Sequence, residues 1–206
     1  HLMPQDYLQP CLQAVAYITR YLHSEAVFLT ATMPDYEKLM REYALPDSRI
    51  VKLIEDTSMF SLFRKCRYSY LGETNQERLL CQSRKYPSSL IIVNRKATAR
   101  ELYQQCEGKK IFREIREELM RLEQDYPSGE TVPEDRRITI VSTSLIEAGV
   151  DLDVYTVFRE RTGLDSILQA GGRCNREGKR TMADVYVFDL EGSEKKAADE
   201  RANFTK

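Results

Sequence analysis

The chain has 206 residues, of which 42% are hydrophobic and 31% charged, enough for one large domain or one and a half ordinary ones. No apolar run approaches the roughly 20 residues of a membrane-spanning helix, and no basic segment followed by an apolar stretch suggests a signal peptide. The formal net charge of −1 limits any nucleic-acid surface to a local basic strip. We therefore expect a cytoplasmic protein without a membrane segment.

The cysteines are scattered and odd in number. The five residues Cys11, Cys66, Cys81, Cys106 and Cys174 include no CxxC pair, and only two histidines accompany them. This pattern indicates reduced thiols and argues against a disulfide framework or a zinc site.

Residues 1–50 predict a helix, a strand and a second helix. Residues 8–22 carry apolar side chains at helical spacing and predict an amphipathic helix. Residues 26–29 (AVFL) form a short apolar run between polar residues, which predicts a buried strand. Pro34 and Asp35 then begin a helix that extends to about Tyr43.

Residues 46–85 are mixed and less periodic. They include a basic cluster at 64–67 and a segment at 67–71 that could form a strand. We interpret the stretch as a connector followed by the entry to a second domain.

The rest of the chain predicts an alternation of strands and helices. Strands are expected at 89–94, 138–142, 155–158 and 185–190, and helices at 96–105, 113–124 and 164–174. Fully apolar strands that alternate with helices indicate a parallel sheet covered on both faces. A parallel sheet of this kind would also need a strand between the helices at 96–105 and 113–124, although the connection between them is short.

Two arginines, Arg173 and Arg176, follow a pair of glycines. On a helix their spacing places both on one face. Each glycine there costs about 1 kcal/mol of helix stability, which suggests that another group approaches the backbone closely. Arginine can supply mobile positive charge to a γ-phosphate through a rigid bidentate fork. Taken alone, however, the pair is better explained as two surface arginines after a helix.

The segment 143–151 follows a predicted strand and should lie at the carboxyl edge of the sheet, where ligands bind. Thr143 and Ser144 offer hydroxyls and backbone N–H groups to a nucleic-acid phosphate. Gly149 permits a tight turn, and Asp151 offers a carboxylate to a ribose or to a water near a metal. An ordinary strand-to-helix loop explains the same residues.

Four segments resemble superfamily-2 helicase motifs, in the order that those helicases show. They are TATMP at 30–34 (motif III), LIIVNRKATARELY at 90–103 (motif IV and its helix), STSLIEAGVDLD at 142–153 (motif V) and LDSILQAGGRCNREGK at 164–179 (motif VI). The last two together are similar to the CRISPR-associated helicase–nucleases of type I interference systems, commonly called Cas three. General DEAD-box proteins carry HRxGRxxR instead.

The resemblance implies an α/β fold with a RecA-like parallel sheet, helices on both faces, and a remnant of a first RecA-like domain. We expect four divisions. Residues 1–50 form the end of the first domain and carry the end of motif II and all of motif III. Residues 51–75 form a connector, residues 76–190 the second domain, and residues 191–206 a charged tail.

The resemblance also implies an activity: ATP-dependent translocation on single-stranded DNA in CRISPR interference. Arg173 and Arg176 would contact the γ-phosphate, with Gln169, Gly149 and Asp151 beside them. The DNA would be held by Asn94, Arg95, Thr143 and Ser144, and Thr30, Ala31 and Thr32 would couple hydrolysis to strand movement.

ATP and Mg²⁺ would be bound mainly by a first motor domain, because the sequence contains no GxxxxGK[ST] phosphate loop. The chain alone is therefore expected to be inactive. Implied partners are single-stranded DNA, an RNA-guided surveillance complex and an HD nuclease domain in the same intact protein. The metal-ligand histidines of that nuclease do not occur in this sequence, so we assign it neither a nuclease activity nor a metal site.

Other readings stay open. Another superfamily-2 DNA or RNA helicase would share the motif order, although Cys174, Asn175 and the LDSI segment weigh against it. An inactive RecA-like platform for protein binding would not need Arg173 and Arg176. A Rossmann-type enzyme would carry a GxGxxG motif, which the sequence lacks.

Overall fold

The structure is a computed structural model that describes residues 7–28, 38, 41–42, 51, 53, 56, 65–106, 112–126, 131–147 and 150–192. The chain divides into two units, His1–Met59 and Phe60–Lys206, and each is described by itself.

The first unit contains the predicted amphipathic helix. Helix α1 spans Leu8–Tyr21 and buries Leu12 and Ala16, which confirms the prediction for residues 8–22. The strand predicted at 26–29 is wrong for the residues described, since 26–28 form no strand and Val27 and Phe28 are exposed. A strand needs a backbone partner, and no other strand is described in this unit to provide one.

Much of the predicted second helix lies outside the described residues. Lys38, Arg41 and Glu42, which the structure does describe, are helical, in agreement with the prediction. Thr30, Ala31 and Thr32 lie outside the described residues.

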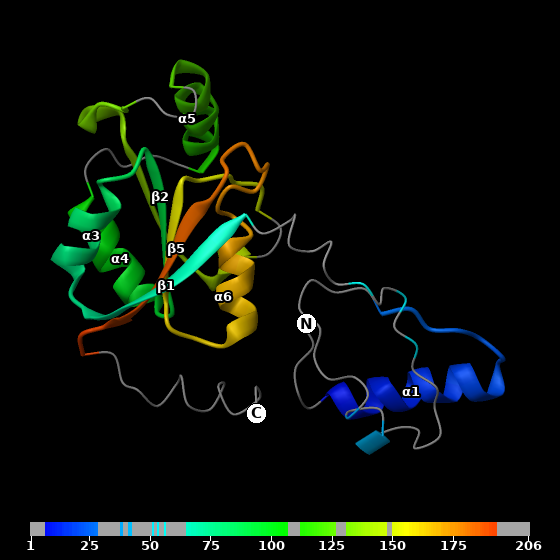
Figure 1. Cartoon of the computed structure of the whole chain (residues 1–206). Coiled ribbons are helices and arrows are strands. Elements are labelled where there is room, and N and C mark those ends of the chain that lie inside the picture. The colour runs from blue at the N-terminus through cyan, green and yellow to red at the C-terminus, as the bar shows by residue number, and fades with distance from the viewer. Residues whose placement is uncertain are drawn as a thin grey trace. The chain divides into compact units, whose positions relative to one another are not determined.

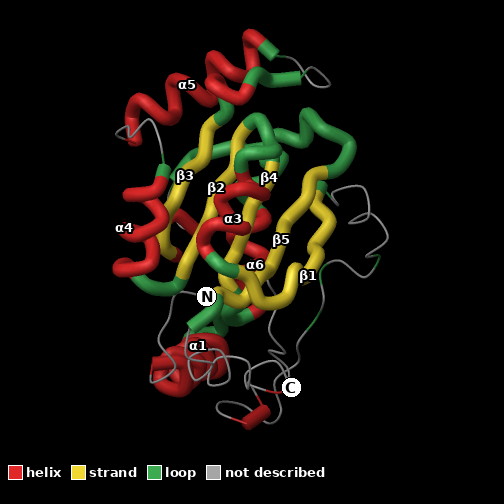
Figure 2. The backbone as a smooth tube through the Cα atoms, turned by 90° about the vertical axis from the view of Figure 1, so that its left-hand side faces the viewer, coloured by secondary structure: helices red, strands yellow, loops and turns green. Residues whose placement is uncertain are grey.

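Five parallel strands form the centre of the second unit (Figures 1 and 2). They are β1 (Cys66–Thr74), β2 (Ser88–Val93), β3 (Ile138–Thr143), β4 (Thr156–Glu160) and β5 (Ala183–Leu190). Their order in the sheet is β1-β5-β4-β2-β3, and every neighbouring pair is parallel. All strands therefore end at one edge of the sheet, the carboxyl edge, and begin at the other, the amino edge.

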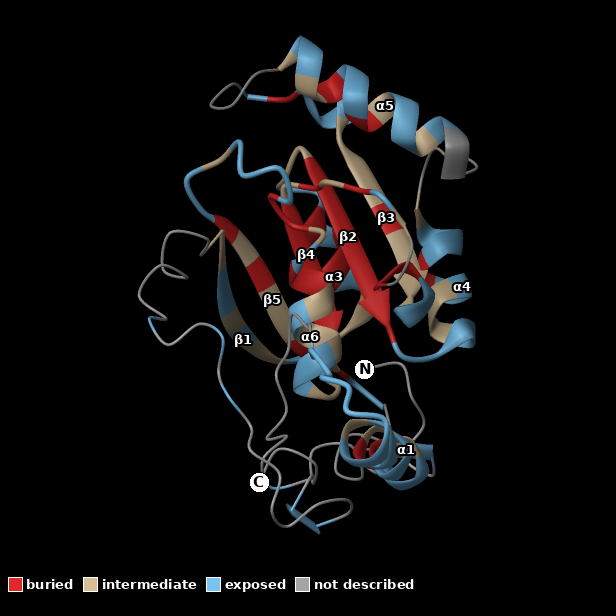
Figure 3. Ribbon diagram, turned by 90° about the vertical axis from the view of Figure 1, so that its right-hand side faces the viewer, coloured by how far each residue is buried: buried red, intermediate tan, exposed pale blue. Residues whose placement is uncertain are grey.

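Helices cover both faces of this sheet. Helices α3 (Gln76–Ser83) and α4 (Lys96–Gln105) lie on one face (Figure 2). Helix α6 (Leu164–Gly171) lies on the other, and α5 (Phe112–Asp125) lies beyond the amino edge (Figure 3). The short 3₁₀ helices are η3 (Glu134–Arg136) and η4 (Ser144–Glu147).

Strand β2 shows why the sequence pattern works. Leu90 and Ile92 join the core cluster that includes Leu119 of α5 and Ala170 of α6. Ile91 and Val93 join the cluster on the other face, with Leu79 of α3 and Leu102 of α4. Because successive side chains point to opposite faces, a strand covered on both sides is mostly apolar on both faces. The predicted α/β class, a parallel sheet with helices on both faces, is confirmed.

Three features differ from the expectations. Strand β1 confirms the possible strand at 67–71, but it pairs with β5 in the sheet, whereas residues 51–75 were expected to form a connector. Helix α6 ends at Gly171, before residue 174. Strands β2 and β3 are direct neighbours, so their crossover holds both α4 and α5 and the sheet needs no strand between these helices. Residues 107–111, between them, lie outside the described residues.

Two further findings concern the earlier expectations. All five cysteines are free thiols, as the sequence predicts. Across the described ranges, no helix has both the length and the apolar character needed to span a membrane.

Candidate functional site

The two arginines lie in a turn after α6, and we call residues Arg173–Arg180 the arginine turn. The expectation that a helix presents both on one face is wrong, because the glycines end the helix at Gly171. Val154 donates to Arg173 O over 3.0 Å and accepts from Asn175 N over 3.2 Å. Since Val154 lies two residues before the start of β4, these bonds place the turn at the amino edge of the sheet.

Gly171 allows the close approach that the glycine pair suggests. A Cβ atom at Gly171 would lie 2.1 Å from the hydroxyl oxygen of Tyr68, which comes from β1. Burial raises the pKa of Tyr68 to about 12. The group that approaches this backbone is therefore a tyrosine of the same chain, and it ties β1 to the start of the turn.

Arg173 points back towards the motif V segment. Its Nη2 donates to Glu147 O, in η4, over 2.7 Å. Its Nε is buried and has no hydrogen-bond acceptor among the residues that the structure describes. Burial lowers the pKa of Arg173, and the nearby charge of Arg176 adds to this, but arginine stays charged in proteins. Arg173 is therefore a directed cation with a spare donor, which suits an anionic ligand.

Arg176 is held more loosely. Its Nη1 lies 3.0 Å from Asp151 Oδ1, and the two side chains are 44% and 65% exposed. Arg116 of α5 also approaches Asp151, with Nη2 3.6 Å from Oδ2. Exposed ion pairs of this kind contribute little stability, so Arg176 can leave Asp151 for another anion at small cost.

Asp153 fixes the backbone of the arginine turn, a role that was not predicted from the sequence. It accepts from the backbone N–H groups of Arg176 and Glu177 over 2.9 and 3.1 Å. It also pairs with Arg180 over 3.1 Å, with side chains 10% and 12% exposed. The guanidinium of Arg180 lies 4.2 Å from the ring centroid of Tyr155. Asp153 closes the motif V segment, so its position in that motif was the available signal.

The residues expected to hold DNA meet at the carboxyl edge. Val93 and Thr143 are paired in register at the ends of β2 and β3, so Asn94 and Arg95 follow one strand end and Ser144 follows its neighbour. Thr143 is half-buried, whereas Arg95 and Ser144 are exposed. The structure therefore brings this group together, at the edge of the sheet opposite the arginine turn.

The side chain of Asn94 has internal partners. Its Oδ1 accepts from Arg159 Nη1 over 2.8 Å, and its Nδ2 donates to Arg161 O over 3.0 Å. Its backbone N–H donates to Glu160 Oε2 over 2.7 Å. Asn94 is thus joined to β4 as well as to the expected DNA-binding edge.

The remaining predicted residues are less informative. Gln169 is half-buried on α6, and its backbone carbonyl accepts from Gly172 N. Gly149 lies outside the described residues. Within the described ranges, no group of three or more His, Cys, Asp or Glu side chains could hold a metal ion.

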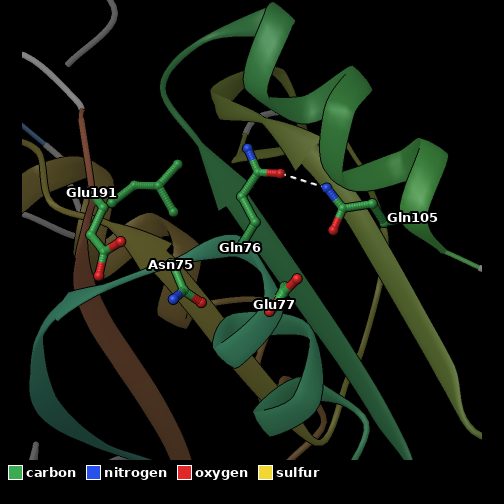
Figure 4. A pocket seen from close by; sticks show the side chains of 6 residues that line it. Asn75, Gln76, Glu77, Gln105 and Glu191 are labelled. Atoms are coloured by element: carbon green, nitrogen blue, oxygen red, sulfur yellow. Dashed lines mark hydrogen bonds between the residues drawn. The ribbon is translucent and has the colours of Figure 1, made fainter.

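A separate pocket of about 430 Å³ opens beside the start of α3 (Figure 4). Gln105 Nε2 donates to Gln76 Oε1 across it, over 2.6 Å. Glu77 and Glu191 also line it. Two carboxylates without a basic side chain among the lining residues do not suit a phosphate, and none of the predicted site residues takes part.

Residues 85–179 match the family model described as CRISPR-associated nuclease/helicase Cas3, C-terminal. This stretch is therefore similar to the C-terminal region of Cas3 nuclease/helicases. The match covers motifs IV to VI, including Asn94, Thr143 and Arg173, and it confirms the resemblance that the motifs indicate. It is consistent with the five-stranded parallel sheet of the second unit.

Curated Cas3 relatives match over short stretches. The Cas3 nuclease/helicase of Haloferax volcanii is 48% identical over 68 residues, 32% of this chain and 7% of that protein. That of Methanothermobacter thermautotrophicus is 31% identical over 114 residues, 53% of this chain and 14% of that protein. The aligned part is thus a small fraction of each relative's length.

Solved structures are more distant. The ATP complex of T. fusca Cas3 is 18% identical, with a TM-score of 0.42 over 64% of this chain and 19% of that one. The Lhr helicase of Mycobacterium smegmatis, bound to single-stranded DNA and AMP-PNP, is 16% identical, with a TM-score of 0.48 over 88% of this chain and 26% of that one. A CRISPR RNA-guided surveillance complex in a pre-nicking state contains a chain that is 17% identical, with a TM-score of 0.37 over 64% of this chain and 19% of that one.

Proposed function

We propose that the chain forms the C-terminal half of an ATP-dependent single-stranded-DNA translocase that unwinds target DNA in CRISPR interference. Its second unit supplies Arg173 and Arg176 to ATP held mainly by a first motor domain. Its carboxyl edge, with Asn94, Arg95, Thr143 and Ser144, holds the DNA strand. Residues 1–50 would close the first RecA-like domain, where Thr30, Ala31 and Thr32 couple hydrolysis to movement.

The observation that carries this proposal is the state of the two arginines. Arg173 is oriented by the carbonyl of Glu147 and keeps a buried Nε without an acceptor in the described residues. Arg176 is joined to an exposed carboxylate that it can exchange. Positive charge at a γ-phosphate is worth about 10³–10⁵ in the rate of phosphoryl transfer when an arginine is delivered to it.

The fit to ATP and Mg²⁺ is partial. The guanidinium groups suit phosphate oxygens, which accept bidentate hydrogen bonds. No cluster of possible metal ligands occurs among the described residues, so the acids that bind Mg²⁺ would come from the first motor domain. Closure of the two domains would bring the halves of the site together.

The rest of the proposal concerns partners. A translocase of this kind would act on DNA displaced by an RNA-guided surveillance complex, and an HD nuclease domain in the same intact protein would degrade the strand. The Cas3 C-terminal match supports both partners. The same match and the directed arginines favour this function over an inactive platform.

The arginines can be tested in the full-length protein. Arg173→Ala and Arg176→Ala should each lower DNA-stimulated ATP turnover by about 10³-fold or more, because each removes positive charge from the γ-phosphate. The dissociation constant of ATP, measured with a fluorescent analogue, should change by less than about 3-fold, since ATP is bound mainly by the first domain.

Arg121→Ala provides the matched control, because Arg121 is an exposed arginine on α5. It should leave turnover unchanged. Weaker ATP binding combined with normal turnover in Arg173→Ala or Arg176→Ala would refute the role of the two arginines.

The DNA edge requires a separate test. Thr143→Ala should weaken binding of single-stranded DNA about 5- to 10-fold, because it removes a hydroxyl from the phosphate path, a contact of about 1 to 1.5 kcal/mol. Fluorescence anisotropy across a salt series would measure it, with Thr139→Ala, farther back in β3, as the control. The same affinity for wild type and Thr143→Ala at every salt concentration would show that Thr143 does not contact DNA.

A further inference from the structure

A buried ion pair lies between the carboxyl edge and the arginine turn. Arg159 of β4 and Glu147 of η4 place Nε and Oε1 2.9 Å apart, with side chains 1% and 7% exposed. Arg159 is the largest of the most deeply buried side chains of the described residues. It lies in a strand whose other residues are also buried.

Ser166 of α6 completes this pair. Its hydroxyl donates to Glu147 Oε2 over 2.6 Å and accepts from Arg159 Nη2 over 2.9 Å. The serine therefore bridges the second carboxylate oxygen and the second guanidinium nitrogen. Side chains from β4, η4 and α6 thus form one hydrogen-bonded group, in which Ser166 fixes the orientation of Arg159 and Glu147.

The pair also connects to both functional regions. Arg159 Nη1 donates to Asn94 Oδ1 over 2.8 Å, at the end of β2. At the other side, the backbone carbonyl of Glu147 accepts from Arg173 Nη2 over 2.7 Å. An unbroken series of contacts thus runs from Asn94 through Arg159 and Glu147 to Arg173.

Stability alone does not explain these residues. Taking two charges out of water is costly, and well-packed apolar side chains in the same space often stabilise a fold as well or better. The surrounding cluster on this face is apolar, with Val157, Ile146 and Ala170 among its members. A buried polar network with fixed geometry can instead transmit a change at one end to the other.

We propose that Arg159, oriented by Glu147 and Ser166, is a positioning residue that couples DNA at Asn94 to the placement of Arg173. This proposal rests on the function proposed above. DNA that draws Asn94 Oδ1 away from Arg159 removes the nearest acceptor of Nη1, which keeps Glu160 O at 2.9 Å and Ile92 O at 3.4 Å. The guanidinium then shifts towards these two carbonyls and carries Glu147 with it, so the Glu147 carbonyl that holds Arg173 moves as well. Coupling of this type changes affinity or rate by about 5- to 150-fold.

Ser166→Ala in the full-length protein is the main test. It removes one hydroxyl and keeps both charges of the ion pair, so the fold is retained. We expect the stimulation of ATP turnover by saturating single-stranded DNA to fall about 5-fold or more, a size typical of coupling between sites. Turnover without DNA, the KM for ATP and the dissociation constant of the DNA should each stay within about 2-fold.

Ser83→Ala is the matched control. Ser166 is half-buried; Ser83 is a buried serine in α3, on the opposite face, and donates to Leu80 O over 2.9 Å. Its loss should leave DNA stimulation intact. A merely structural role of Ser166 would lower turnover with and without DNA in parallel and would not change their ratio.

Arg159→Lys is the second variant. Lysine can pair with Glu147 but cannot form the planar fork that also reaches Ser166 and Asn94. We therefore expect it to lose DNA stimulation as Ser166→Ala does. Circular dichroism would verify that the variant is folded.

Unchanged DNA stimulation in both Ser166→Ala and folded Arg159→Lys would overturn the coupling. If Arg173→Ala and Thr143→Ala still behaved as expected, the proposed function would stand and only the coupling would fail. Normal turnover in Arg173→Ala would instead overturn the proposed function and the coupling with it.

Discussion

At the scale of single residues, the two arginines differ more than their spacing suggests. Arg173 is half-buried and hydrogen-bonded to a backbone carbonyl, whereas Arg176 is exposed and paired with Asp151. Motif order singled out Arg173 and Arg176 as γ-phosphate contacts, and that role stays a prediction. Motif order could not predict these partners, because they depend on how residues 150–153 fold back against the arginine turn. Asp153 was missed for the same reason.

Gly171 supports a prediction at this scale. Gly171→Ala should lower the free energy of unfolding by about 1–3 kcal/mol, because the new methyl group overpacks against the Tyr68 ring and hydroxyl. Alanine otherwise favours a helix by about 1 kcal/mol over glycine. Urea denaturation of the purified chain would measure the change.

The control for this substitution is the Tyr68→Ala background, which removes the clashing ring. There, Gly171→Ala should be neutral or stabilising. An equal loss of stability in both backgrounds would mean that the Tyr68 contact does not determine the cost.

At the scale of elements, the central strands were predictable and the edge strand was only suggested. Strands β2 and β4 are buried throughout, and each contains a short apolar run, LIIV in β2 and VF in β4. Strand β1 lies at the edge of the sheet and has several exposed residues, including Tyr68 and Tyr70. Its pattern therefore resembles a loop. Helix α3 did carry a local signal, since Asn75 Oδ1 accepts from Arg78 N at the start of the helix.

The segment before β4 supports a prediction at this scale. Asp153→Ala should lower the free energy of unfolding by about 2–4 kcal/mol, because it leaves Arg180 and two backbone N–H groups of the arginine turn without their acceptor. Urea denaturation would measure this, with Asp135→Ala, an exposed aspartate in η3, as the control. A loss below about 0.5 kcal/mol, the usual size for an exposed site, would show that Asp153 does not fix the turn.

At the scale of the whole molecule, the fold of the second unit followed from the sequence because alternating strands and helices admit few arrangements. The positions of the candidate sites on the sheet did not follow from the sequence. The DNA-binding candidates lie at the carboxyl edge, while the arginines lie at the amino edge, joined through Arg159 and Glu147. In the first unit, the apolar run at 26–29 predicted a strand, but pairing depends on partners that an apolar pattern does not reveal.

The central claim is that this chain supplies half of an ATPase site. The most direct measurement is ATP turnover by the purified 206-residue chain with saturating single-stranded DNA, compared with the full-length protein under the same conditions. We predict DNA-stimulated turnover for the full-length protein and none above background for the chain, because its sequence has no phosphate loop. Robust DNA-stimulated turnover by the chain alone would contradict the claim.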